Sequence, residues 1–198
     1  MGEVRWVLAH DVEAAAADLA TSFLDDPMTS WLADIADPDV RRTALVDGFF
    51  RPALQIGRRK GHSYRGPDGA AIWAPPDVEI LPEADLPELI GPFVEAFGEP
   101  ALDRLSALGA LVGEHHPHDR GPHAYLFILG VARPGGGRGS ALLTPVLDRC
   151  DDDGVGAYLE SSSGRNVSFY ERQGFAVLWE ARPTEDGPMM RGMWRDPR

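Results

Sequence analysis

A glycine-rich run at residues 132–140, ARPGGGRGS, has residue types and spacing that suit one particular chemistry. It follows a nearly all-apolar segment, His123–Val131, and precedes a helical pattern, which predicts a strand, a turn and a helix N-terminus. The first N–H groups of a helix lack intrahelical partners, and glycine lets the backbone approach a phosphate closely. The run therefore predicts a phosphate or pyrophosphate site, with a ligand-free flexible turn as the alternative. Its candidate residues are Gly135, Gly136, Gly137, Gly139 and Ser140.

The glycine pattern departs from two nucleotide-binding motifs. A P-loop needs a lysine after its glycines, and the chain reads GGGRGSA at this point. A dinucleotide-binding turn needs a third glycine three residues after the second, and Leu142 stands there instead. The loop therefore argues against both kinds of nucleotide site.

Four histidines lie close together in the run EHHPHDRGPH, namely His115, His116, His118 and His123. Their number suggests a metal, but neither the H-E-x-x-H nor the H-x-x-E-H order is present. Cys150 is the only cysteine, so the chain offers neither an internal disulfide nor a site with several cysteine ligands. We therefore expect no bound metal.

The run SSSGRNVSFYERQGF, at residues 161–175, places an aromatic pair inside a short polar helical pattern. Tyr170 can be an amphipathic core tyrosine, which its spacing alone favours. Its hydroxyl group can also serve as a general acid. The run by itself leaves both roles open.

The elements that would position these residues follow from the periodicity of the apolar side chains. Strands are predicted at residues 4–9, in a hairpin at 62–76 that turns at PDG, and at 123–131, 155–160, 175–182 and 187–194. A helix begins after Asp11 and ends near Pro27, and further helices span 37–54, 99–116 and 141–150, with short helices and loops at 79–98. Pro52 is expected to kink or end the second helix, and the aspartates at 151–153 to end the last. The segment 123–131 reads as a strand that is buried on both faces.

The composition narrows the class of protein. The 198 residues suit a single domain that spans residues 1–198. The net charge of -12 argues against nucleic acid and anionic membranes as partners and favours cations, although acidity can serve solubility alone. Lys60 is the only lysine, which argues against a Schiff-base mechanism. No window has the apolar length of a membrane-spanning helix, and the charged N-terminal residues do not suit a signal peptide, so we expect a cytoplasmic protein.

The order of these segments resembles the GNAT acetyltransferase superfamily, and more narrowly the puromycin N-acetyltransferase type. The resemblance covers most of the chain, including FLDDP, AAIWAPP, HHPHDRGPHAYLFILGV and AYLESSSGRNVSFYERQGF, of which the last is the most specific. It implies an α/β fold with a mixed, mostly antiparallel sheet, helices on both faces and splayed central parallel strands. Those strands would be residues 123–131 and 155–160, and acetyl-CoA would insert between them.

The resemblance also implies roles for particular residues. Backbone groups near Leu129 and Val131 would pair with the acetyl and pantetheine amides, and the glycine loop would take the pyrophosphate. Asn166 matches the asparagine of the family that contacts pantetheine. Tyr170 matches the general acid, whose hydroxyl group would donate to the sulfur of the leaving thiolate.

One departure from the family concerns the glycine loop. The family pattern begins with Gln or Arg, and that position holds Pro134 or Gly136 here, depending on how the loop is aligned. Arg133 or Arg138 would have to compensate for the missing side chain.

The acceptor side of the implied site has its own candidates. Glu160 ends a strand and could take the proton from an ammonium group, although a solvated strand-end charge is the alternative. Asp25, Asp26 and Trp31 lie in the segment that would cover the acceptor, where carboxylates beside an aromatic ring suit a cationic amine. A helix-capping role for Asp25 or Asp26 is the rival explanation. Trp73 is a second aromatic candidate for contact with the body of the substrate.

The sequence thus predicts an acetyl-CoA-dependent N-acetyltransferase that acts on a primary amine of a small, cationic metabolite or antibiotic. One alternative is an enzyme that acetylates a protein N-terminus or lysine, which would need an open groove. Another is a non-catalytic module that binds CoA or a drug. We expect a monomer or a homodimer.

Overall fold

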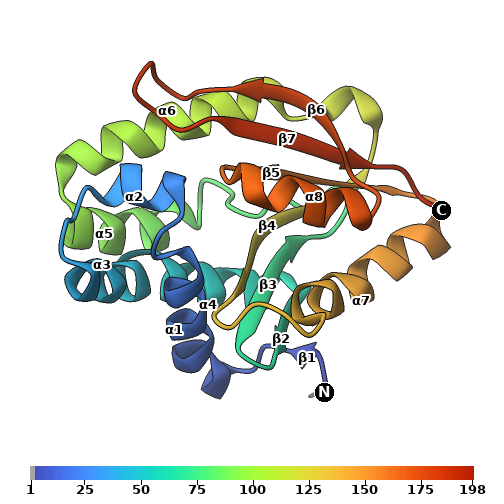
Figure 1. Cartoon of the computed structure of the whole chain (residues 1–198), viewed down its shortest axis with the longest axis horizontal. Helices are drawn as coiled ribbons and strands as arrows, with labels where there is room; N and C mark the ends of the chain where they lie inside the picture. Colours follow the sequence, from blue (N-terminus) through green and yellow to red (C-terminus); the bar gives the residue numbers. More distant parts are fainter. Residues whose placement is uncertain (1–2) are drawn as a thin grey trace.

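A seven-stranded sheet, in the order β1-β2-β3-β4-β5-β7-β6, runs through the computed structural model, which describes residues 3–198 (Figure 1). The strands are β1 (Arg5–Trp6), β2 (Ser63–Gly66), β3 (Gly69–Ala74), β4 (His123–Val131), β5 (Gly156–Ser161), β6 (Ala176–Ala181) and β7 (Met190–Arg195). β4 and β5 are parallel, and the other neighbouring strands are antiparallel. The predicted mixed, mostly antiparallel sheet is therefore confirmed.

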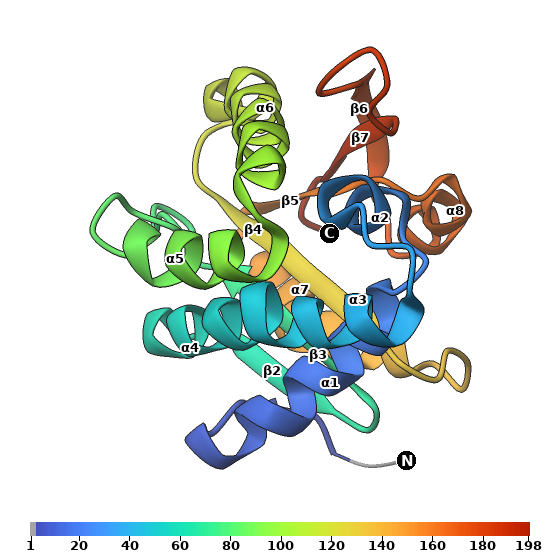
Figure 2. The same ribbon diagram turned by 90° about the vertical axis from the view of Figure 1, so that its left-hand side faces the viewer.

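Helices surround the sheet (Figures 1 and 2). They are α1 (Val12–Phe23), α2 (Pro27–Ala33), α3 (Pro38–Leu45), α4 (Arg51–Lys60), α5 (Leu86–Phe97), α6 (Glu99–His115), α7 (Arg138–Asp153) and α8 (Gly164–Arg172). A π-helical turn, η2 (Val46–Phe50), joins α3 to α4, and two short 3-10 turns lie at η1 (Ala9–Asp11) and η3 (His118–Arg120). Within residues 3–198, no helix combines the length and the apolar character that crossing a bilayer requires.

Two hydrophobic cores lie on the two faces of the sheet. On one face, α1, α4 and the π-helical turn bury Leu19, Leu54 and Phe50. On the other face, α7 and α8 pack on a core that includes Leu143 and Trp73. The prediction of helices on both faces is therefore confirmed.

The two central parallel strands separate after Leu126. β4 and β5 form four residue pairs, the last between Leu126 and Leu159, and beyond it β4 continues only alongside β3. The register of β3 and β4 shifts at this point, which leaves Phe127 as an extra residue on β4. Such a bulge bends its strand and increases the local twist. The bulge therefore accounts for the opening between β4 and β5 that the family resemblance implied.

Several predicted boundaries are wrong. The first strand is only two residues long, and the predicted helix at 37–54 is a run of α3, η2 and α4 that continues to Lys60. Pro52 does not end this run, because it lies in the first turn of α4, where a missing N–H is tolerated. α7 continues through the three aspartates and ends at Gly154, whose left-handed φ of 69° suits glycine.

β4 was expected to be buried on both faces, and the structure corrects this expectation. Along the strand, buried residues alternate for most of its length with half-buried ones, namely Tyr125, Phe127, Leu129 and Val131. The strand is therefore partly uncovered, and this uncovered part leads to the site.

Candidate active site

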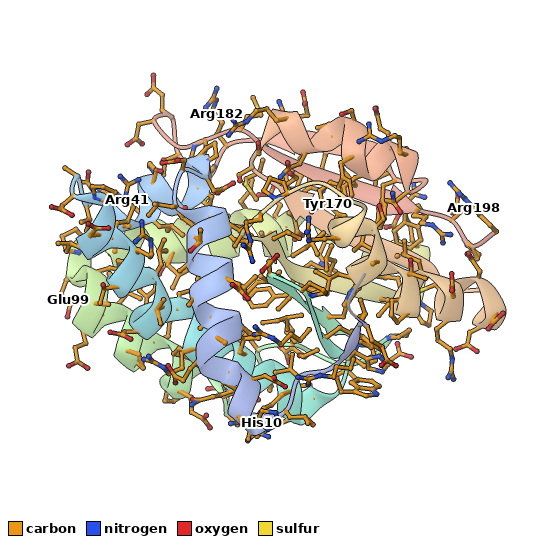
Figure 3. The ribbon with its side chains drawn as sticks, turned by 60° about the horizontal axis from the view of Figure 1, so that its bottom comes forward. His10, Arg41, Glu99, Tyr170, Arg182 and Arg198 are labelled. Atoms are coloured by element: carbon orange, nitrogen blue, oxygen red, sulfur yellow. The ribbon has the colours of Figure 1, made fainter. Side chains whose placement is uncertain are left out.

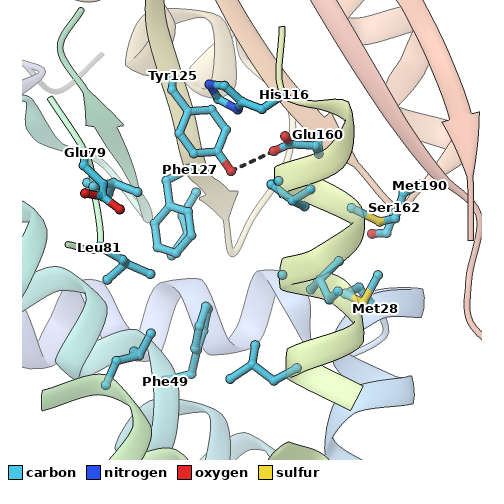
Figure 4. A pocket seen from close by; sticks show the side chains of 18 of the residues that line it. Met28, Phe49, Glu79, Leu81, His116, Tyr125, Phe127, Glu160, Ser162 and Met190 are labelled. Atoms are coloured by element: carbon cyan, nitrogen blue, oxygen red, sulfur yellow. Dashed lines mark hydrogen bonds between the residues drawn. The ribbon is translucent and has the colours of Figure 1, made fainter. Parts of the chain in front are cut away.

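A pocket of about 940 Å³ lies against β4 and β5 (Figure 4). Its other walls come from the end of α1, from α2, the π-helical turn, α6 and the segment at 75–81 (Figure 2 shows these helices around β4). Most of the lining side chains are apolar, and the polar ones include Glu160, Tyr125, Ser162, Asp26 and His116. A pocket of this size and character suits a small organic molecule.

Glu160 reaches this pocket from β5, one residue beyond the last β4–β5 pair. Its Oε2 accepts a hydrogen bond of 2.7 Å from the Tyr125 hydroxyl group, and its Oε1 is buried and has no partner among the described residues (Figure 4). Burial raises the pKa of Glu160 to about 7, while the hydroxyl groups of Tyr125 and Tyr158 lower it. A carboxyl group with a pKa near neutrality can accept and release a proton under physiological conditions.

Tyr125 is a site residue that the sequence reasoning missed. It stands opposite Tyr158 in the parallel register, and the two rings stack with their centroids 5.9 Å apart. The Trp179 indole donates a hydrogen bond of 3.1 Å to the Tyr158 hydroxyl group. The stacking of these rings and the bond from Trp179 fix the positions of the side chains around Glu160. Tyr125 and Phe127 are two residues apart, and this spacing indicates that they share one face of the strand. A strand expected to be buried on both faces gives no reason to single out either side chain as a site residue.

Asp26 both caps a helix and lines the pocket, so the capping explanation does not remove it from the site. As the N-cap of α2 it accepts hydrogen bonds from the backbone N–H groups of Met28 at 2.9 Å and Thr29 at 3.3 Å. It also lines the pocket and accepts from the Ser162 hydroxyl group, at 2.9 and 2.7 Å from its two oxygens. Burial raises the pKa of Asp26, and the bond from Ser162 opposes the shift. Asp25, in contrast, is exposed and does not line the pocket, so the structure does not bring it to the site.

The two tryptophans predicted to contact the substrate do not line the pocket. Trp73 is fully buried in the core under α7, on the other face of the sheet, so this prediction is wrong. Trp31 packs with Met28 and Leu108 in a small cluster beside the pocket. The aromatic lining comes instead from other elements, mainly Phe49 and Phe127.

Tyr170 lies in the interior of the molecule, whereas Glu99 and Arg198 lie at its periphery (Figure 3). Its ring meets the rings of Phe169 and Phe175 edge to face, at centroid distances of 5.0 and 5.9 Å, as the packing interpretation expects. Burial raises the pKa of Tyr170, and the charge of nearby Asp26 raises it further. The hydroxyl group therefore keeps its proton at neutral pH and can act as a donor. The general-acid role remains a prediction.

The glycine loop divides into two parts. Gly135, Gly136 and Gly137 have positive φ values of 112°, 61° and 73°, and no side chain caps the α7 N-terminus that follows. Such a loop fits an anion. Gly139 lies within α7, where an added Cβ would be 3.1 Å from the Phe169 ring, and the Ser140 hydroxyl group accepts a 3.0 Å hydrogen bond from Gln173. Packing of α7 against α8 therefore explains these last two residues.

Both loop arginines contact one carboxylate. Asp68, in the turn between β2 and β3, forms an ion pair with Arg133 and lies 3.6 Å from the Nε of Arg138. Arg138 also donates a hydrogen bond of 3.0 Å to the carbonyl oxygen of Gly135. A phosphate at this loop would thus compete with Asp68 for the two guanidinium groups.

The remaining predicted cofactor contacts lie along the opening between the strands. The Val131 N–H donates a 3.0 Å hydrogen bond to the Ser22 hydroxyl group of α1, and Leu129, two residues earlier, directs its N–H to the same edge. Asn166 is exposed in the first turn of α8.

The histidines pack with one another and with aromatic rings. His116 and His123 form a hydrogen bond of 3.0 Å between their Nε2 atoms, and the Nδ1 of His123 lies 2.8 Å from the carbonyl oxygen of Gly121. Burial lowers the pKa of His116 to about 4, so its ring is neutral at physiological pH. His115 packs against Trp179. Among residues 3–198, no group of three or more ligating side chains is arranged to hold a metal ion.

No protein-family model matches the chain. A structure from Corynebacterium glutamicum, described as histone acetyltransferase HPA2 and related acetyltransferase, is similar at 24% identity and a TM-score of 0.64, over 100% of this chain and 97% of that one. The polyamine N-acetyltransferase of Drosophila melanogaster is 15% identical with a TM-score of 0.58, over 99% and 100% of the two chains. Arylalkylamine N-acetyltransferase 2 of Aedes aegypti is 12% identical with a TM-score of 0.57, over 100% and 99%. The chain therefore has the fold of GNAT acetyltransferases.

Proposed function

We propose that the protein is an N-acetyltransferase that moves the acetyl group of acetyl-CoA to a primary amine of a small cationic molecule. The observation that carries this proposal is the buried, unpartnered Oε1 of Glu160, which belongs to a carboxyl group with a pKa of about 7. Glu160 lines the pocket just beyond the point where β4 and β5 separate. A carboxylate in that place can remove the proton that an ammonium group must lose before it attacks.

The chemistry divides between two residues. Glu160 accepts the ammonium proton, and the neutral nitrogen attacks the carbonyl carbon of the thioester. The C–N bond forms as the C–S bond breaks, and its electron pair stays on sulfur. Tyr170, protonated at neutral pH, donates its proton or a hydrogen bond to that sulfur. The acetylated nitrogen then releases its second proton to solvent, from which Tyr170 regains any proton it gave. Glu160 also releases the ammonium proton to solvent and is again a carboxylate.

Acetyl-CoA is the co-substrate and supplies the acetyl thioester. The backbone of Leu129 and Val131 would hold its amides at the edge that β5 leaves free, once Val131 exchanges its bond to Ser22. Asn166 would add a contact from α8. The anion site at the start of α7, with Arg133 and Arg138 beside it, would bind the pyrophosphate.

The shape of the pocket favours a small acceptor over a protein. α6 and the segment at 75–81 wall the pocket on the sides away from the sheet, whereas a peptide substrate needs an open groove. The similar Drosophila enzyme forms N-acetylagmatine, and the similar Aedes enzyme is named for arylalkylamines, which are small amines. The narrower puromycin N-acetyltransferase type is part of the proposal on its sequence motifs alone.

The test measures thiol release from acetyl-CoA with a panel of amines, and acetyl-CoA binding separately by calorimetry. Glu160→Gln should lower kcat/KM at neutral pH by about 10²- to 10⁴-fold, the range of one general base, and leave acetyl-CoA binding unchanged. Glu171→Gln, an exposed change on α8, should have no effect. Tyr170→Phe should lower kcat in the same way if Tyr170 is the acid.

A folded Glu160→Gln variant is expected because the raised pKa of Glu160 makes its ionisation unfavourable to folding. Between the unfolded pKa of about 4.3 and the folded pKa of about 7, rising pH removes stability, and removing the charge restores it. The variant should therefore melt above the wild type in alkaline buffer. Heat-stable protein that binds acetyl-CoA but acetylates no amine would support the non-catalytic alternative instead.

A further inference from the structure

The charged side chains that line the pocket are all acidic. They are Asp26, Asp77, Glu79 and Glu160, and no lysine or arginine of residues 3–198 lines it. Of the three histidines in the lining, His116 is held neutral by burial, which lowers its pKa to about 4. Negative charge in a pocket with apolar walls attracts cations strongly, because little water screens it.

The four carboxylates fall into two pairs. Asp26 and Glu160 belong to the inner end of the pocket, where Ser162 and Tyr125 contact them. Asp77 and Glu79 belong to the exposed segment between β3 and α5. In the close view, Glu79 and Glu160 lie on opposite sides of Phe127 (Figure 4). The pocket therefore has an acidic group at each end and an apolar wall between them.

The outer pair differs from two nearby carboxylates. Asp85, the N-cap of α5, forms a 2.7 Å ion pair with Lys60, and Glu88, within α5, forms a 2.9 Å ion pair with Arg59. Among the described residues, Asp77 and Glu79 have neither an ion pair nor a side-chain hydrogen bond. At the inner end, the buried Oε1 of Glu160 also has no partner. Carboxylates at both ends of one cavity, with no basic side chain of residues 3–198 in its lining, favour a ligand that carries a cation at each end.

We propose that the acceptor carries two cationic groups separated by an apolar chain or ring. The reacting ammonium lies between Glu160 and Asp26, the second cation lies at Asp77 and Glu79, and the apolar part lies along Phe127. This inference rests on the proposed function. An amine with a single charge and an apolar tail would place hydrocarbon beside Asp77 and Glu79 and leave these carboxylates without a cationic partner.

The test compares diamines with monoamines of equal chain length. Butane, hexane, octane and decane derivatives serve as acceptors, each as the terminal diamine and as the monoamine. In the wild type, kcat/KM should favour the diamine at the chain length that reaches both ends, by about fivefold beyond the statistical advantage of its two identical amines, as an exposed ion pair allows. The doubly substituted Asp77→Asn, Glu79→Gln variant should lose this preference, because its kcat/KM should fall more for the diamine than for the monoamine. Glu83→Gln, an exposed change in the same segment outside the pocket lining, should keep it.

A binding measurement separates this inference from the proposed function. Calorimetry with the diamine and the matched monoamine, in the absence of acetyl-CoA, should show tighter binding of the diamine to the wild type and not to the double variant. Turnover of amines without any diamine preference would overturn the inference and leave the acetyltransferase standing. Absence of turnover, with tighter diamine binding that the double variant loses, would overturn the proposed reaction and leave the two-cation site standing. Equal binding of both amines would overturn the inference whatever the turnover.

Discussion

The proposed base depends on hydroxyl groups that oppose the effect of its burial. Burial alone favours the protonated form of Glu160, and the Tyr125 hydroxyl group, 2.7 Å from its Oε2, favours the charged form. His116, which also packs against Tyr125, is neutral at physiological pH and adds no charge. The balance between burial and the hydroxyl groups of Tyr125 and Tyr158 leaves the pKa of Glu160 near neutrality, where a general base is most effective.

Replacing Tyr125 by phenylalanine should therefore raise the pKa of Glu160 further. A hydrogen bond to a charged group contributes about 1.5–3 kcal/mol, which corresponds to a rise of roughly one to two pH units. The acid limb of the kcat/KM profile should move to higher pH by that amount, because Glu160 must be ionised to accept a proton. Activity well above the new pKa should stay near that of the wild type.

The matched control for Tyr125→Phe is Tyr64→Phe, which removes a hydroxyl group from the core on the other face of the sheet. Its profile should coincide with that of the wild type. If the acid limb of Tyr125→Phe does not move, Glu160 is not the group that titrates in that limb.

The sequence proposed Glu160 as a carboxylate at a strand end and Asp26 from the segment that the family resemblance places over the acceptor, and both line the pocket. It could not identify Tyr125, because which side chains of β4 face the pocket depends on the bulge at Phe127, and a run of apolar residues does not show where a bulge lies. It misplaced Trp73 because alternation along β3 does not show which face of the sheet borders the pocket.

At the scale of elements, α6 contains two glycines whose presence packing does not explain. A Cβ added at Gly109 or Gly113 would have no neighbouring atom within 4 Å, and neither residue has a positive φ. Glycine within a helix costs about 0.5–1 kcal/mol relative to alanine. Both glycines line the pocket. The absence of a side chain at these positions lowers helix stability but leaves space for the acceptor.

Gly109→Leu should therefore raise the stability of the protein and weaken its binding of the acceptor. The gain in helix propensity of about 0.8 kcal/mol should raise Tm by about 2 °C. The new side chain should enter the pocket and raise KM for bulky acceptors more than for small ones. Ala110→Leu places the same side chain on an exposed position of α6 outside the pocket and should leave KM unchanged. A lower Tm, or equal effects on large and small acceptors, would contradict this account.

The π-helical turn shows why element boundaries were hard to predict. The run at 37–60 has a continuous helical pattern, and this pattern does not indicate that residues 46–50 form a π-helix. Gly48 is the clue in retrospect, since an added Cβ would lie 2.5 Å from Ala96 of α5. The close approach of α5 to this turn is a tertiary contact, and the turn carries Phe49 into the pocket.

At the scale of the whole molecule, the fold followed from the order of strand, glycine loop, helix and strand together with the family resemblance. The opening between β4 and β5 came from the resemblance alone, because strand separation leaves no mark in composition or periodicity. The acidic character of the chain, in contrast, was visible at once and reappears in the lining of the pocket.

We expect the short pairing of β4 with β5 to divide the sheet into two units that open separately. Among the described residues, four residue pairs join the strands β1 to β4 with the strands β5 to β7. Amide hydrogen exchange should therefore report two opening free energies, with the exposed edge strand β6 and its neighbour β7 exchanging through the smaller one. A ligand that forms hydrogen bonds with both strands at the opening would link the two units. Saturating acetyl-CoA should therefore slow amide exchange in both units and make their opening free energies more alike. Uniform protection of the free protein, measured by mass spectrometry, would show that the helices already join the two units without any ligand.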